Sequence, residues 1–99
     1  GEPDFTAVAA MSDTMAIGAC RAIFDFGFSV PHDISVVGFD GIAMTRFYNP
    51  VITTIRQPSK EIAHQSVIQL LGQIEGWTEA KNIILETDMV AGKSVKRLL

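Results

Sequence analysis

The chain has 99 residues, of which 47% are hydrophobic and 19% are charged, and its formal net charge is −3. This amount of apolar material can form a core and argues against disorder, while the acidic balance offers no basic face for nucleic acid. No apolar run approaches the ~18 residues of a membrane span, so no membrane partner is expected. Cys20 is the only cysteine, which excludes an intrachain disulfide and fits a reducing compartment. The basic residues 93–97 are interpreted as a solvated tail.

Strand-like and helix-like segments alternate along the chain. The pattern predicts a strand at 5–11, a helix at 14–26, a buried strand at 34–39, a loop at 41–50, a strand at 52–55, a helix at 60–75 and a strand at 83–90. Ser12 or Asp13 can cap the first helix and Ser59 the second, because their oxygens accept hydrogen bonds from free backbone N–H groups. Gly27 and Gly76 are expected to end these helices. Strands separated by helices favour right-handed crossovers, so we predict an α/β fold with a parallel sheet flanked by helices.

Both predicted helices carry one apolar stripe at helical spacing. The first stripe is Ala16, Ala19, Cys20, Ile23 and Phe24, and the second is Ala63, Val67, Leu70, Leu71 and Ile74. Two helices cannot cover both faces of a parallel sheet of about four strands. The chain also begins without an initiator Met. We therefore expect it to be part of a larger α/β domain.

The segment 30–40 is the most informative one. Its apolar run, from Ile34 to Phe39, is typical of a strand buried on both faces of a parallel sheet. Asp40 follows at once, and open α/β sheets bind their ligands at the carboxyl edge. Asp40 is therefore a candidate ligand-binding residue. The alternative is a strand-end aspartate that forms a turn with its own backbone.

Three blocks, at residues 12–18 (SDTMAIG), 30–40 (VPHDISVVGFD) and 50–58 (PVITTIRQP), resemble the LacI/GalR family of bacterial transcriptional regulators in order and spacing. The helix after the third block and the segment 89–94 extend the resemblance over essentially the whole chain. It implies a fragment of a two-lobed effector domain that resembles type I periplasmic binding proteins. Residues 1–56 would then lie mostly in the C-terminal lobe, 57–86 would cross to the N-terminal lobe, and 87–99 would return.

The resemblance also implies a function. The chain would be the effector-binding and dimerisation region of a cytoplasmic regulator that forms a homodimer or a higher oligomer. A sugar is the first choice of effector, and a purine or another metabolite is the alternative. Operator DNA would be bound only through an N-terminal domain that this chain lacks, and no cofactor is expected.

By their positions in the family's pattern, Asp40, Ser12, Asp13 and Gln57 are the expected ligand-binding residues. The family usually has Asn-Asp where this chain has Ser12-Asp13, and serine has a shorter reach. Helix capping is the competing role for Ser12 and Asp13, and a hinge or supporting role competes for Gln57. Expected dimer contacts are Ile17, Arg21, Phe47 and Tyr48, with local packing as the alternative.

Two other functions compete with the regulator. One is a periplasmic sugar-binding protein of a transport system. The other is an enzyme or phosphoacceptor domain with Asp13 and Asp40 as paired carboxylates. The sequence has no positioned lysine, phosphate-binding glycine loop or nucleophile set, so we expect no enzyme. His64 has no partner at metal-ligand spacing, so no metal site is expected. Trp77 could stack on a sugar, but its place after Gly76 favours packing on the helix end.

Overall fold

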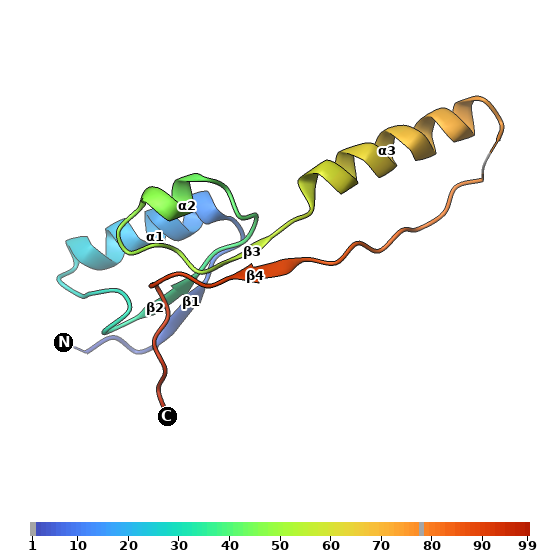
Figure 1. Cartoon of the computed structure of the whole chain (residues 1–99). Helices are drawn as coiled ribbons and strands as arrows, with labels where there is room; N and C mark the ends of the chain where they lie inside the picture. The colour runs from blue at the N-terminus through green and yellow to red at the C-terminus, as the bar shows by residue number, and fades with distance from the viewer. Residues whose placement is uncertain (1, 78) are drawn as a thin grey trace. The chain divides into compact units, whose positions relative to one another are not determined.

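The structure is a computed structural model that describes residues 2–77 and 79–99. Its elements are β1 (Ala7–Ala9), α1 (Asp13–Asp25), β2 (Ser35–Val37), α2 (Met44–Phe47), β3 (Thr54–Arg56), α3 (Ser59–Ile74) and β4 (Asp88–Val90) (Figure 1). They fall into two compact units: the sheet unit, Gly1–Arg56 with Asp88–Leu99, and the helix unit, Gln57–Thr87. The assignment of these units to two lobes stays a prediction.

The strands of the sheet unit are mostly parallel, as the alternation of strands and helices predicts. β1 pairs with β2 in parallel, with Val8 opposite Val36. Two isolated parallel bridges, Val37 with Thr53 and Asp40 with Arg56, lead from the end of β2 towards β3. The expectation of a parallel last strand was wrong, because β4 is antiparallel to β3. The chain leaves the sheet unit along β3 and returns to it along β4. Because the two strands pair with each other, they run in opposite directions.

Helix α1 begins and ends as the sequence predicts. The Ser12 hydroxyl accepts a hydrogen bond from the Met15 N–H at 3.2 Å, so Ser12 is the N-cap. At the other end, Gly27 adopts a φ of 87°. The Phe28 N–H donates to the Ile23 carbonyl at 3.1 Å, which is the hydrogen bond of a Schellman motif.

Helix α3 has a different start from the one expected. Its N-cap position is Pro58, with no side-chain cap, so the prediction that Ser59 caps it was wrong. Its end is as predicted: Gly76 has a φ of 77°, and the Trp77 N–H donates to the Gly72 carbonyl at 2.8 Å. The Trp77 side chain is 78% exposed, so the expectation that it packs on the helix end was also wrong.

The core of the sheet unit lies where α1 packs against β1 and β2 (Figure 1). Its buried residues are Ala16, Cys20, Ile23, Val30, Ile34, Val36 and Ile52. Three of the five residues in the predicted α1 stripe belong to this cluster. Burial raises the pKa of the Cys20 thiol, which suits a packing role. The loop expected at 41–50 contains the one-turn helix α2, whose short length gives no periodic signal.

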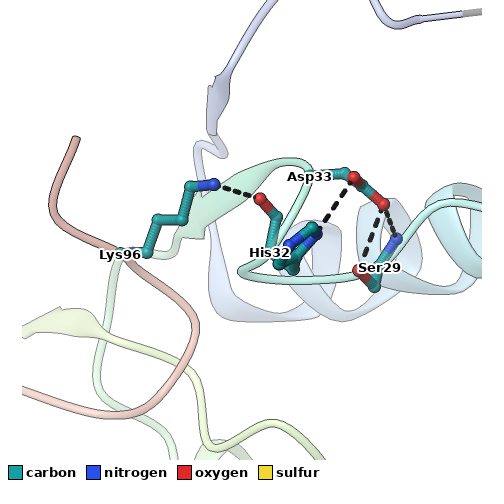
Figure 2. Close-up of polar contacts among 4 residues, drawn as sticks. All are labelled: Ser29, His32, Asp33 and Lys96. Atoms are coloured by element: carbon teal, nitrogen blue, oxygen red, sulfur yellow. Dashed lines mark hydrogen bonds and ion pairs between the residues drawn. The ribbon is translucent and has the colours of Figure 1, made fainter.

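A polar turn precedes β2 (Figure 2). The Asp33 carboxylate accepts hydrogen bonds from the N–H and the hydroxyl of Ser29, at 2.8 and 3.1 Å, and lies 3.2 Å from His32 Nδ1. The Ser29 N–H is the main reason that the pKa of Asp33 is lowered. The Lys96 ammonium donates to the His32 carbonyl. Lys96 thus contacts this turn while it stays exposed, as the prediction of a solvated basic tail requires.

Candidate functional site

The carboxyl ends of β1 and β2 meet at one edge of the sheet unit. The Ala10 N–H donates to the Val37 carbonyl at 2.9 Å, just beyond the two strands. Three residues after Ala10, the Asp13 N–H donates to the Phe39 carbonyl at 2.9 Å. The start of α1 therefore lies beside the segment that carries Asp40. This is the edge at which the sequence predicts a ligand site.

Asp13 joins three segments at this edge. Its side chain is fully buried, with 0% exposure. One carboxylate oxygen accepts the N–H groups of Gly41 and Ile42, at 2.7 and 2.8 Å. The other accepts the Thr54 hydroxyl at 2.5 Å. Asp13 is thus the first residue of α1 but not its cap, since Ser12 supplies the capping oxygen.

Asp40 is half-buried and has an unusual backbone. Its φ is 124°, a value that non-glycine residues rarely adopt. The Asp40 N–H donates to the Ile55 carbonyl at 2.9 Å, and a bridge pairs Asp40 with Arg56. Such a conformation costs on the order of 1–3 kcal/mol and persists only where the surrounding structure fixes it. Strain of this kind is concentrated at binding and catalytic sites.

Two glycines permit the close packing around Asp40. A β-carbon on Gly38 would lie 3.2 Å from the Asp13 Cα and would overlap the Asp13 carboxylate. A β-carbon on Gly41 would lie 2.7 Å from the Arg56 Cα, and Gly41 also has a φ of 79°. Side chains at these two positions would push α1 and β3 away from the segment that carries Asp40.

A small cavity of about 110 Å³ lies beside this segment. It is lined by Gly41, Ile42, Thr45, Arg46, Thr54, Arg56 and Val90. The Thr45 hydroxyl donates to the Ile42 carbonyl at 2.7 Å, and Arg56 lies 3.5 Å from the Asp88 carboxylate. Pockets for small organic ligands usually measure about 300–1,000 Å³. This cavity alone is too small for a sugar.

Gln57 belongs to the helix unit. There it lines a groove of about 410 Å³ together with residues of α3 and of the extended segment 81–87. Its expected contact with a ligand stays a prediction.

The four expected dimer residues differ in their exposure. Ile17 and Tyr48 are half-buried and pack against the core, and burial raises the pKa of the Tyr48 phenol. Arg21 is exposed and lies 3.3 Å from the Asp25 carboxylate, one helical turn further on. Phe47 is 82% exposed at the end of α2. The contact of all four residues with a second subunit stays a prediction.

Sequence reasoning did not identify Ser94, which is fully buried. Its hydroxyl donates to the Val36 carbonyl at 2.5 Å and accepts the Thr53 N–H at 2.8 Å. Ser94 therefore links Val36 of β2 to Thr53, the residue before β3. A serine in a short polar segment carries no sequence signal for this role.

The rest of the described chain offers no metal site. Across residues 2–77 and 79–99, no group of three or more His, Cys, Asp or Glu side chains could hold a metal ion. None of the described helices combines the length and the apolar character needed to span a membrane.

Residues 2–95 match the periplasmic binding protein-like domain family. The HTH-type transcriptional regulator MalR of Clostridium butyricum is 49% identical over 87 residues, which are 88% of this chain and 26% of MalR. The chain thus spans about a quarter of this curated relative.

Solved structures agree with this match. A lac repressor dimer bound to operator and the anti-inducer ONPF has a TM-score of 0.84 and 38% identity, over 91% of this chain and 32% of that one. The transcriptional regulator CelR in complex with cellobiose has a TM-score of 0.87 and 32% identity, over 93% of this chain and 28% of that one. These findings confirm the predicted fold class and the resemblance to LacI/GalR regulators. The chain therefore belongs to the periplasmic binding protein-like domain family, and its relatives there are LacI-type transcriptional regulators.

Proposed function

We propose that this chain is the effector-binding and dimerisation region of a LacI/GalR-type transcriptional regulator, and that its effector is a sugar. One observation carries the proposal. Asp13 binds the residues on both sides of Asp40: its N–H donates to Phe39, and its carboxylate accepts from Gly41. Asp40 is thereby held at the carboxyl edge of the sheet, beside the start of α1, where open α/β sheets bind ligands.

The chemistry of this edge suits a sugar. A carboxylate offers acceptors for the paired hydroxyl donors of a sugar, and the Ser12 hydroxyl can both donate and accept. A hydrogen bond to a charged group contributes about 1.5–3 kcal/mol. CelR, a structural neighbour, was solved with cellobiose, which supports a sugar over a purine.

The remaining parts of the proposal concern the whole protein. Gln57 would add a ligand contact, and operator DNA would be bound by a domain outside this chain. The relatives named above are transcriptional regulators, which favours a cytoplasmic regulator without catalytic activity.

We also propose a homodimer whose contacts include Phe47 and Arg21. Both side chains are exposed in the sheet unit, and aromatic residues and arginine are enriched in protein interfaces. Ile17 and Tyr48 are the other two contacts that we propose, and both are only half-buried in this chain.

The effector site can be tested in the full-length protein that contains this chain. Isothermal titration with a panel of disaccharides, including cellobiose, and with purine bases identifies the effector class. Asp40→Asn keeps the side-chain size but removes one acceptor, and we expect it to weaken sugar binding at least tenfold. Asp4→Asn, on an exposed residue near the start of the chain, is the matched control and should bind as the unmodified protein does. Unchanged affinity in a folded Asp40→Asn variant would contradict the proposal.

A further inference from the structure

We propose that Asp13 is a positioning residue, which holds Asp40 in its effector-binding geometry without touching the effector itself. The proposal rests on the function proposed above, in which Asp40 contacts the effector. This role differs from both roles that the sequence leaves open for Asp13, which are ligand contact and helix capping.

Asp13 has no surface to offer a ligand. Its side chain is 0% exposed, and each carboxylate oxygen already accepts at least one hydrogen bond from the protein. Three donors converge on it: the N–H groups of Gly41 and Ile42 and the hydroxyl of Thr54. A β-carbon placed on Gly38 would overlap the Asp13 carboxylate, so the Gly38 backbone encloses the carboxylate on that side too. An effector contact would require Asp13 to give up these bonds.

The same bonds fix the backbone on both sides of Asp40. The Asp13 N–H holds Phe39, and the Asp13 carboxylate holds Gly41 and Ile42. Between these anchors Asp40 has a φ of 124°. A strained backbone conformation is kept only by the surrounding structure, so it relaxes when the hydrogen bonds of the neighbouring residues are removed. The loss of the Asp13 carboxylate should therefore move Asp40 even though the two side chains need not touch.

Asp13 also ties this segment to β3. The Thr54 hydroxyl donates to Asp13, and the next residue, Ile55, accepts the Asp40 N–H through its carbonyl. Thr54 is fully buried. One carboxylate thus sets the position of the Asp40 segment relative to both α1 and β3.

The three converging donors explain why an aspartate is needed here and an asparagine would not serve. An aspartate accepts hydrogen bonds at both oxygens, whereas the amide of asparagine accepts at one atom and donates at the other. In an Asp13→Asn variant the NH₂ group would face either the Thr54 hydroxyl or the two backbone N–H groups. An NH₂ group facing the backbone would lose both N–H bonds. An NH₂ group facing Thr54 could donate to the hydroxyl, but the hydroxyl would no longer donate to residue 13, and all three bonds would lose the charge of the carboxylate. The side-chain volume hardly changes in either case.

The test is a double-mutant cycle in the full-length protein. The probe is the disaccharide that binds the unmodified protein most tightly in the panel described above. We expect Asp13→Asn to weaken its binding at least tenfold. Asp40→Asn should also weaken it at least tenfold in the unmodified background, but less than twofold when Asp13→Asn is already present. A purely structural role would lower the folded fraction and leave the two effects on the folded protein additive.

A second measurement needs no effector. Amide hydrogen exchange of Gly41 and Ile42 should become at least tenfold faster in Asp13→Asn, while exchange in the middle of α1 stays unchanged. Unchanged exchange at these two amides would overturn the inference. So would additive effects in the cycle, or Asp13→Asn binding within twofold of the unmodified protein.

Thr54 supplies a milder pair of variants if Asp13→Asn does not fold. Thr54→Val removes the hydroxyl donor and keeps the shape, so it should weaken binding severalfold. Thr54→Ser restores the hydroxyl and should restore the affinity. Equal affinity of Thr54→Val and Thr54→Ser would count against the inference. If Asp40→Asn has no effect in the unmodified background, the proposed function fails as well; if it weakens binding but Asp13→Asn does not, the inference alone fails.

Discussion

Helices α1 and α3 carry apolar stripes of the same kind, but only α1 buries its stripe. Ala16, Cys20 and Ile23 of α1 lie in the core of the sheet unit. The predicted stripe of α3 is exposed in the described chain, and Gly72 is the only buried residue of that helix. An amphipathic pattern therefore predicts a helix and its apolar face, but it does not show which element packs against that face. Most of the stability of a helix in a protein comes from such packing.

The two units also differ in their polar contacts. In the sheet unit, buried hydrogen bonds join residues far apart in sequence, such as Thr54 with Asp13 and Ser94 with Val36. In the helix unit, side-chain hydrogen bonds run between neighbouring turns of α3, from Gln65 to Glu61 and from Ser66 to the Ile62 carbonyl. We therefore expect matched substitutions in the two units of the 99-residue chain to differ in cost.

The largest difference is expected for isoleucine truncation. Ile34 is 2% exposed in the core, whereas Ile74 is 69% exposed at the end of α3. Ile34→Ala should lower the free energy of unfolding by about 2–5 kcal/mol, because it removes buried methyl groups and leaves a cavity. Ile74→Ala should change it by less than about 0.5 kcal/mol. Urea unfolding followed by circular dichroism measures both, and equal costs would contradict the contrast between the units.

A smaller difference is expected for two glycines with the same backbone conformation. Gly41 and Gly76 have φ values of 79° and 77°. A β-carbon at Gly41 would meet the Arg56 backbone, whereas none of the described atoms lies within 4 Å of one at Gly76. Gly76→Ala should cost about 1 kcal/mol for the left-handed conformation alone. Gly41→Ala should cost about 3 kcal/mol, since the clash adds to that term.

Chemical denaturation of the two alanine variants, at matched protein concentration, tests this expectation. A Gly41→Ala variant as stable as Gly76→Ala would show that β3 can move away from Gly41 at little cost. Asp40 would then be less firmly held than the hydrogen bonds suggest.

The smallest difference concerns the two helix starts. Ser12 accepts the Met15 N–H, whereas α3 has no side-chain cap and Ser59 is its first residue. Ser12→Ala should destabilise the chain by about 1 kcal/mol. Ser59→Ala should have almost no effect. The thermal unfolding midpoints of the two variants provide the measurement, and a larger loss for Ser59→Ala would contradict the assigned caps.

Much of the fold was predictable from local signals. A capping residue at Ser12 or Asp13, the stop at Gly27 and the apolar stripe predicted α1 to within a residue of its bounds, because each of these signals acts on its own helix. The structure decided that Ser12 is the cap. The apolar run before Asp40 likewise predicted β2 and placed Asp40 beyond its end. At the start of α3 the prediction was wrong by one residue, because the N-cap position is Pro58 and Ser59 is the first residue of the helix.

Non-local features were not predictable in the same way. The direction of β4 depends on which strand it pairs with, and its sequence pattern is the same for either direction. Ser94 and Thr54 resemble surface residues in the sequence, yet both are buried because their hydroxyls satisfy groups on distant segments.

The sequence by itself determined that Asp40 follows a buried strand and that a helix begins next to Ser12 and Asp13, because strand and helix signals are local. Only the tertiary structure decided that Asp13 is enclosed and that its carboxylate binds the residue after Asp40 and reaches Thr54 on β3. The physical reason is that a carboxylate can be buried only if hydrogen-bond donors surround it in the folded structure. Those donors come from residues 28 to 41 positions away, where no sequence periodicity extends.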